Sequence, residues 1–284
     1  MPTGISASTT KTASTSSCSG SAGAYTARAL AGFIHIVGCR SPIKSNVADY
    51  APTGYKRAAE EREFALAWQF GQILGSGPAT IRFMGVWDTV GSIIVPRGDR
   101  LVPTLVTLPH ARANPSVRVF RQALAIDERR RMFRLNRWTP RQPFATNRFA
   151  EDPPQVQEIK QVWFAGVHSD IGRGYPETES GLAKFPLTWM IDQAVAHGLK
   201  INGAMKNQLA LGKPGMGCKS RDVSPNCLAD THDSLAGFWN AREWLPKAVR
   251  WRERDRPSLM GYDLSRGKPR LIESGPGSPS CIAR

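Results

Sequence analysis

The sequence predicts an α/β protein in which helices flank a mostly parallel sheet. Two segments, residues 80–87 and 161–167, are apolar runs of strand length bounded by turn residues. Segments with the apolar spacing of helices lie before, between and after them, an alternation typical of parallel sheets. The chain has 284 residues. One core of that size buries roughly 75 % of the unfolded surface, so we expect one main domain.

For the N-terminal part of the chain, the sequence predicts a tail followed by two helices. Residues 1–18 are mostly Ser, Thr, Ala and Gly, a low-complexity composition typical of disorder. Between residues 25 and 37, apolar side chains recur at the i, i+3, i+4 and i+7 positions of a helix. Residues 40–55 are interpreted as a loop. Residues 56–74 are predicted to form a second helix, which the Gly-Ser-Gly-Pro run at 75–78 ends.

The middle of the chain contains both predicted strands. The first covers residues 80–87, and a proline-containing loop follows it. Residues 117–126, with the sequence VRVFRQALAI, are predicted to be helical. After a proline-flanked loop at 139–154, the second strand covers residues 161–167.

For the last part of the chain, the sequence predicts helices and then a polar tail. Pro186 stands where the first turn of a helix accepts proline, and residues 187–197 continue that helix up to a glycine. Residues 239–251 are interpreted as a shorter helix. We therefore divide the chain into a disordered tail, a globular domain and a loop-like tail: 1–18, 19–251 and 252–284.

The charge of the chain is strongly positive and unevenly distributed. Lys and Arg number 38 and Asp and Glu 23, a net charge of +15. Residues 97–148 hold twelve arginines and no lysine against three acidic residues, and so carry +9 of that total. Arginine suits bidentate contacts to carboxylate or phosphate. Nucleic acid, an anionic membrane surface and a phosphorylated substrate all fit this charge, and so does a solvated helical face with internal ion pairs.

Other features of the sequence limit the class of protein. No apolar run approaches the ~20 residues of a membrane-spanning helix, and no secretory signal precedes the domain, so we expect a cytoplasmic location in the producing cell. The five cysteines are scattered and include no C-x-x-C pair. This spacing predicts neither a disulfide framework nor a zinc site, and it suits a reducing compartment.

Ionisable residues follow both predicted strands. Asp88 comes directly after the first strand and His168 directly after the second. Because the carboxyl ends of parallel strands meet at one edge of the sheet, where ligands bind, these side chains are expected to lie close together.

A third candidate, Ser21, stands in the run Ser-Gly-Ser-Ala-Gly just before the first helix. This run is similar to the G-x-S-x-G turn that exposes a nucleophilic serine at the edge of a hydrolase sheet. The amide of the next residue, Ala22, would then help to stabilise an oxyanion. The chain order Ser21, Asp88, His168 is the order of nucleophile, acid and base in that fold.

Each of these residues also has a structural interpretation. A Ser/Gly-rich run arises easily by composition, and Asp after a strand is usually a turn or capping residue. His168 is alternatively a structural histidine or, with Asp170, part of a metal pair, although two ligands are too few to indicate a metal. His232 is a possible substitute for His168 as the base.

Several sequence blocks resemble one known family of α/β-hydrolases. The blocks are GAYTARALAGF at 23–33, GVWDTVG at 85–91, ALAIDERR at 123–130, VWFAGVHSDIG at 162–172 and HDSL at 232–235. They are similar to a family, long catalogued as a domain of unknown function, that includes the phospholipase effectors of bacterial type VI secretion systems. The similarity covers roughly residues 19–250.

The resemblance implies a serine esterase that acts on the acyl esters of phospholipids. Ser21 would be the nucleophile, His168 the base and Asp88 the acid of the triad, and no metal or organic cofactor would be needed. The expected partners are a lipid or other ester substrate and an anionic membrane surface. The resemblance also implies export as an effector.

The sequence departs from the family pattern around Ser21. The family reads G-F-S-R-G-A there, whereas this chain has Ser19, Gly20 and Ala22 at the first, second and fourth of these positions. The apolar strands that precede this turn in the family are not recognisable, so we expect a hydrolase fold incomplete at its N-terminus. These departures favour one alternative, a catalytically inactive remnant of the family. The charge favours another, a basic module that binds nucleic acid or membrane surfaces. Nucleic acid is the less expected partner, because the chain lacks the aromatic-interleaved basic strands and the zinc spacing of known nucleic-acid readers.

Overall fold

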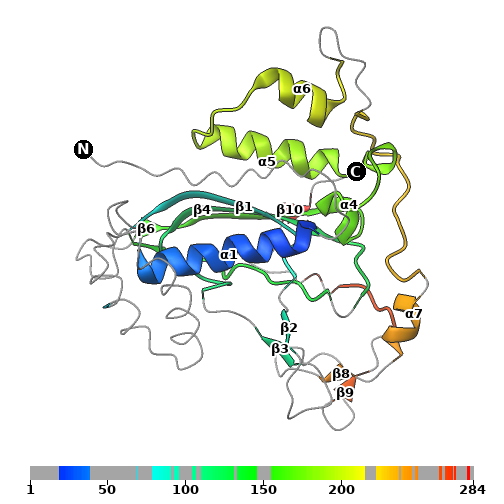
Figure 1. The fold of residues 1–284 in the computed structure, drawn as a ribbon, viewed down its shortest axis with the longest axis horizontal. Helices are drawn as coiled ribbons and strands as arrows, with labels where there is room; N and C mark the ends of the chain where they lie inside the picture. The colour runs from blue at the N-terminus through cyan, green and yellow to red at the C-terminus, as the bar shows by residue number, and fades with distance from the viewer. Residues whose placement is uncertain are drawn as a thin grey trace, which may run out of the picture.

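A computed structural model describes the fold of the chain (Figure 1). The described residues are 19–38, 69, 79–90, 93–95, 104–106, 110–130, 133–145, 155–214, 222–236, 238–244, 247–248, 262–263, 266–270, 272 and 280–281.

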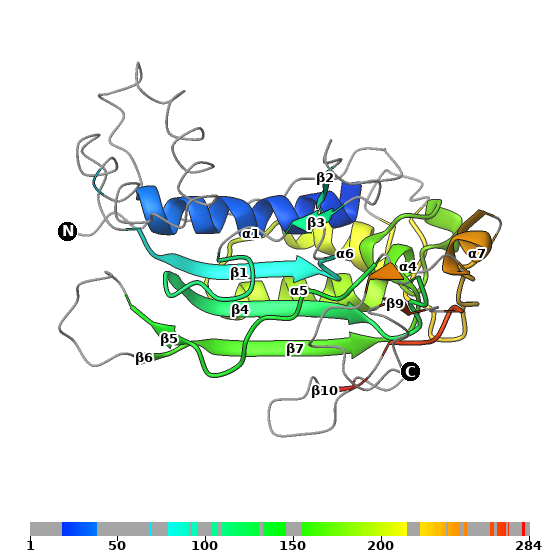
Figure 2. The same cartoon turned by 90° about the horizontal axis from the view of Figure 1, so that it is seen from below.

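The centre of the described fold is a parallel sheet of four strands. These strands are β1 (Ile81–Trp87), β4 (Val117–Ala125), β7 (Glu158–Phe164) and β10 (Ser280–Cys281). They lie in the order β1-β4-β7-β10, and every neighbouring pair is parallel. Because the strands run the same way, β1, β4 and β7 end at one edge of the sheet, as Figure 2 shows.

Helices cover both faces of this sheet. Helix α1 (Ser19–Val37) contacts β1 from one face, and α5 (Lys184–Ala196) contacts β1 and β4 from the other. Helix α6 (Gly203–Leu211) packs on α5 outside it, so that the sheet lies between helical layers (Figure 1). The predicted α/β class with a mostly parallel sheet agrees with this arrangement.

The core has two halves, one on each face of the sheet. On the side of α1, the ring of Phe120 stacks on that of Trp138 with centroids 4.2 Å apart, and both side chains are buried. The buried members of this half are Ala24, Ala31, Met84, Val86, Val117, Phe120 and Trp138. Small residues of α1 face the sheet here, which lets the helix approach closely.

The half of the core on the side of α5 depends on a glycine in β1. A Cβ atom at Gly85 would lie 2.5 Å from Sδ of Met190, so the Met190 side chain packs directly over the glycine and would have to shift to admit a larger residue. The buried members of this half are Ala123, Ala125, Val162, Phe164, Ile171 and Met190. Successive residues of β1 serve opposite faces, as the two-residue period of a strand requires.

One predicted helix is a strand. Residues 117–126 were expected to be helical, whereas Val117–Ala125 form β4, between β1 and β7. The structure buries two polar side chains of this strand, those of Arg121 and Gln122. The guanidinium of Arg121 pairs with Glu158, whose side chain is exposed, and donates to Gln193, so the charge of the buried arginine is compensated. The prediction was wrong because these partners lie far away in the chain.

The two predicted strands and the helix after Pro186 are confirmed, with shifted boundaries. The helix predicted for 239–251 is shorter: α7 covers Phe238–Glu243, and Lys247–Ala248 form β8. Pro246 has no N–H to donate within a continuing helix.

The remaining described elements are short. Strand β8 pairs with β9 (Tyr262–Asp263), β2 (Ile93–Val95) with β3 (Thr104–Val106), and β5 (Pro143–Phe144) with β6 (Gln155–Val156), all antiparallel. Helix α4 covers His168–Gly172, and a 3-10 turn covers Glu177–Glu179.

Some predictions lie outside the described residues, namely the tail at 1–18, most of the loop and helix between 40 and 74, and most of the segment 252–284. Within that last segment, β10 extends the sheet beside β7, so this part of the predicted loop-like tail belongs to the fold. The division of the chain at residues 18 and 251 stays a prediction. Among the described helices, none is both long and apolar enough to cross a membrane.

Candidate active site

Asp88 is held at the end of β1 by the neighbouring strand. Its backbone N–H donates to the carbonyl of Ala123 at 2.7 Å, and its Oδ1 accepts from the N–H of Ala125 at 2.9 Å. The side chain is 0 % exposed. The backbone takes a φ of 27°, a strained value for a residue with a Cβ. The chain therefore turns sharply at this position, with the carboxylate inside the fold.

His168 is the first residue of α4, directly after the turn that follows β7. Gly166 in that turn has a φ of 114°, where a Cβ would come within 2.6 Å of Asp170. Asp170 caps the helix by accepting from the N–H of Val167 at 2.9 Å. The N–H of His168 donates to Oε2 of Glu128 at 3.1 Å. These contacts fix the backbone that carries the imidazole.

Asp88 and His168 meet at the carboxyl edge of the sheet. Nδ1 of His168 lies 2.6 Å from Oδ2 of Asp88, and both side chains are buried. An ionised carboxylate can only accept, so Nδ1 carries the proton and Nε2 is left as the acceptor of a neutral ring. None of the described residues hydrogen-bonds Nε2. This leaves one nitrogen of an oriented imidazole for another partner.

Arg270 binds the other side of the same carboxylate. Its Nη1 lies 2.6 Å from Oδ1 of Asp88, and its Nη2 lies 3.0 Å from Oδ2. Burial acts to raise the pKa of Asp88, but the Arg270 charge and the hydrogen bond of His168 outweigh it and hold that pKa well below its usual range. Asp88 is therefore ionised throughout the neutral pH range.

A second carboxylate, Glu128, supports the site from the end of β4. Its Oε1 accepts from the N–H and the Nε of Arg130, and its Oε2 accepts from Nη2 of Arg130 at 2.8 Å. The ring of Phe133 stands edge-on to that of His168, with centroids 5.0 Å apart. The imidazole is thus bordered by an aromatic ring on one side.

Asp170 and His232 form a separate carboxylate–imidazole pair. Nδ1 of His232 lies 2.6 Å from Oδ1 of Asp170, and its Nε2 lies 3.2 Å from Oε2 of Glu179. The ring of Tyr175 stacks on that of His232 at 3.5 Å between centroids. Partial burial acts to lower the pKa of His232, but its hydrogen bonds to the two carboxylates raise it.

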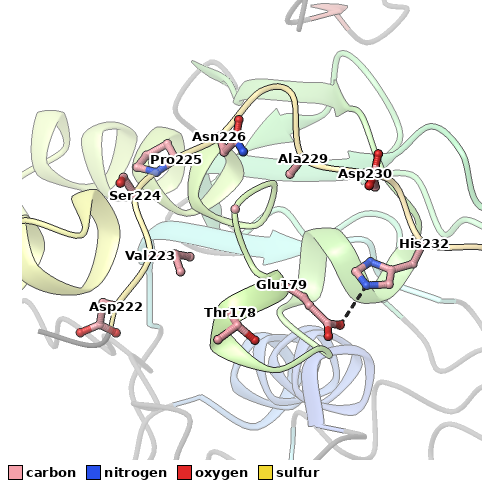
Figure 3. A pocket seen from close by; sticks show the side chains of 11 residues that line it. Thr178, Glu179, Asp222, Val223, Ser224, Pro225, Asn226, Ala229, Asp230 and His232 are labelled. Carbon is pink, nitrogen blue, oxygen red and sulfur yellow. Dashed lines mark hydrogen bonds and ion pairs between the residues drawn. The ribbon is translucent and has the colours of Figure 1, made fainter.

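His232 also lines a cavity of about 750 Å³. Figure 3 shows this pocket between the 3-10 turn and the segment 222–232, with the bond from His232 to Glu179 at its edge. Its carboxylates belong to Glu179, Asp222 and Asp230, and neither Asp88 nor His168 is among its lining residues. His232 therefore pairs with a different aspartate from the one that binds His168.

The third predicted residue, Ser21, belongs to the beginning of helix α1. Ser21 and Ala22 belong to the first turn of α1, while their side chains lie outside what the structure describes. Helices α1 and α4 contact each other, and both views show the beginning of α1, in dark blue, next to α4 (Figures 1 and 2). The roles of Ser21 and Ala22 stay predictions.

The arginine-rich segment 97–148 divides between internal and surface positions. Arg121 pairs with Glu158, and Arg130 pairs with Glu128 while covering the ring of Phe133 at 3.7 Å. Arg112, Arg118, Arg129 and Arg141 are exposed. Part of the local positive charge is thus neutralised inside the fold.

The described residues contain no metal-binding group of three or more His, Cys, Asp or Glu side chains. His168 and Asp170, considered above as a metal pair, bind different partners, Asp88 and His232.

A parallel sheet that carries a buried aspartate–histidine pair at the carboxyl ends of its strands is the arrangement of many hydrolases. Residues 20–193 match the model of the catalytic domain of the type VI secretion system (T6SS) phospholipase effectors of the Tle1-like type. This match covers more than half of the chain, and the chain belongs to that family. The suspected family resemblance is confirmed, and the family is one of lipase-type hydrolases.

A curated relative is the uncharacterized protein YEL023C of Saccharomyces cerevisiae, which is 30 % identical over 82 residues. The matched region is 28 % of this chain and 11 % of that protein. No solved structure matches the chain.

Sequence reasoning missed Arg270 and the role of Glu128. Arg270 lies outside the matched residues 20–193, in a segment predicted to be a polar tail. Arg270 stands 182 positions after Asp88 in the sequence, and no local pattern reports a contact over such a separation. Glu128 lies within a block that resembles the family, but its hydrogen bond with the N–H of His168 could not be predicted from the sequence.

Proposed function

We propose that this chain is a serine esterase with an α/β-hydrolase fold that hydrolyses the acyl esters of phospholipids. The observation that carries the proposal is the 2.6 Å hydrogen bond between buried Asp88 and His168 at the carboxyl edge of the sheet. The family match adds the substrate class. The proximity of the beginning of α1 to α4 supports Ser21 as the nucleophile.

In the proposed reaction, Oγ of Ser21 attacks the ester carbonyl carbon while its proton passes to Nε2 of His168. The imidazolium that forms donates from Nδ1 to Asp88, whose carboxylate stabilises the charge. The amide of Ala22, near the positive end of the α1 dipole, would bind the oxyanion.

The tetrahedral intermediate then expels the lysophospholipid alcohol, which takes the proton from His168 and leaves an acyl group on Ser21. Water attacks this acyl-enzyme, and His168 again accepts the proton and returns it to Ser21 as the fatty acid leaves. The chain's own residues carry every proton in this sequence.

The proposal extends to where the protein acts. Membership of an effector family favours synthesis in the cytoplasm and action after export, on an anionic membrane surface. The exposed arginines of segment 97–148 would favour such a surface through their charge.

The test compares Ser21→Ala with the matched control Ser19→Ala, which removes a hydroxyl from the same turn of α1. We expect the wild-type chain and Ser19→Ala to release fatty acid from phospholipid vesicles and to react with a fluorophosphonate probe. Ser21→Ala should lose both. Labelling or turnover that persists in Ser21→Ala would refute the assignment, and a folded wild-type chain without either would identify an inactive member of the family.

A further inference from the structure

We infer that Arg270 is a positioning residue of the site: its guanidinium holds the Asp88 carboxylate in the orientation that receives the hydrogen bond of His168. This inference rests on the proposed function, because it assigns Arg270 a part in the same triad. It also extends the site beyond residues 20–193, the region that matches the family.

The guanidinium of Arg270 has four hydrogen-bond acceptors around it. Besides the two Asp88 oxygens, Nη1 donates to the carbonyl of Ala125 at 2.8 Å and Nη2 donates to the carbonyl of Phe133 at 2.8 Å. The arginine side chain is 10 % exposed. A planar group bound at both ends to backbone carbonyls cannot rotate freely, so it presents both N–H groups to the carboxylate in a fixed plane.

This geometry determines which oxygen of Asp88 faces His168. Oδ1 accepts from the N–H of Ala125 and from Nη1 of Arg270, whereas Oδ2 accepts from Nη2 and from Nδ1 of His168. Without Arg270, Oδ2 would keep the imidazole as its single described donor. The broad torsion about the Cβ–Cγ bond of an aspartate would then be much less restrained.

The segment that carries Arg270 is itself attached to the fold. The carbonyl of Gly267 accepts from Nε of Arg129 at 2.8 Å, and the N–H of Arg266 donates to the carbonyl of Glu243 at 3.3 Å. Gly267 has a φ of 63° and lies so close to Leu235 that a Cβ would come within 2.4 Å of its Cδ1. Residues 266–270 therefore follow a defined path to Asp88.

The sequence offers a matched control within the same segment. Lys268 is exposed and has the same charge as Arg270, but it makes no contact with Asp88. Arg270→Gln and Lys268→Gln each remove one positive charge, and the two positions are only two residues apart. Arg270→Lys keeps the charge and removes the planar fork. Together these variants separate orientation from net charge.

The first readout is the proton NMR signal of the His168 Nδ1–H, which a hydrogen bond to a carboxylate moves far downfield. The wild-type chain should show this signal, and His168→Gln should lack it and so assign it. We expect Arg270→Gln to lose the signal and Lys268→Gln to keep it. If Arg270→Gln does not fold, Arg270→Lys serves in its place, and its signal should be shifted and broadened.

The second readout is turnover on phospholipid vesicles. We expect Arg270→Gln to lower kcat about 10²-fold with little change in KM, since a misplaced catalytic group costs about that factor. Arg270→Lys should recover part of the loss, and Lys268→Gln should match the wild type. A downfield signal that stays unchanged in folded Arg270→Gln would overturn the inference, whether or not kcat falls.

The two readouts also separate this inference from the proposed function. The NMR signal needs no substrate, so a wild-type chain without esterase activity would refute the function while a signal lost in Arg270→Gln still supports the positioning contact. Activity in the wild type together with an intact signal in folded Arg270→Gln would refute the contact alone.

Discussion

Replacing Asp88 by asparagine tests whether the carboxylate is the centre of the buried network. The carboxylate accepts hydrogen bonds from Ala125, from both Nη atoms of Arg270 and from His168. Asparagine has nearly the same shape and keeps Oδ1, but its amide group would face Nη2 and Nδ1, which are both donors. Two charge-assisted hydrogen bonds are therefore lost.

The expected loss of stability in Asp88→Asn follows from these two hydrogen bonds. Hydrogen bonds to charged groups contribute about 1.5–3 kcal/mol each, and removing one partner of a buried ion pair costs about 3–5 kcal/mol. A shift of the His168 proton from Nδ1 to Nε2 would let Nδ1 accept from the asparagine amide and would recover one contact. We therefore expect Asp88→Asn to lower the free energy of unfolding by about 3 kcal/mol at pH 7.

The pH dependence gives a second check on the same variant. The folded-state pKa of Asp88 lies below the unfolded value, so its stabilising contribution is complete above that value and declines as the pH falls. The unfolded pKa is about 3.9, and each pH unit below it removes about 1.4 kcal/mol. The difference between wild type and Asp88→Asn should thus narrow by about 1 kcal/mol between pH 7 and pH 3.

The assay is urea unfolding followed by tryptophan fluorescence at both pH values. The matched control is Asp233→Asn on the surface, where Oδ1 accepts from the N–H of Leu235 at 2.9 Å and an amide oxygen can do the same. This control should stay within about 0.5 kcal/mol of the wild type. An Asp88→Asn variant as stable as the wild type at pH 7 would refute the reasoning. So would a stability difference between the two proteins that is as large at pH 3 as at pH 7.

Two further predictions concern ion pairs other than the one between Asp88 and Arg270. The Lys184 side chain is 0 % exposed, with Nζ 2.5 Å from Oε1 of Glu177, so Lys184→Met should lower stability by about 1–3 kcal/mol in thermal unfolding, while exposed Lys200→Met should not. The raised pKa of His232 beside Asp170 means that its stabilisation is present below about pH 6.5 and is lost as the pH rises through the folded pKa. The stability difference between wild type and His232→Gln should therefore be larger at pH 5.5 than at pH 9, and equal differences would contradict the pairing.

The fold could be predicted from the sequence wherever one local pattern dominated. The run at 80–87 and the run at 161–167 are apolar enough that burial in a parallel sheet is the simplest interpretation, and both form strands. The segment 117–126 was predicted to be a helix, but it forms a central strand that buries Arg121 and Gln122. Their partners come from other elements, and local spacing contains no information on such partners.

The sequence by itself determined the family, the α/β class and the expectation that Asp88 and His168 meet, because parallel strands end at a common edge. The tertiary structure decided the rest of the site: Arg270 beside Asp88, Glu128 beneath His168, and His232 paired with Asp170 instead. These contacts join residues far apart in the chain, and their geometry depends on how layers pack. Packing is a property of the whole fold, so no short stretch of sequence specifies it.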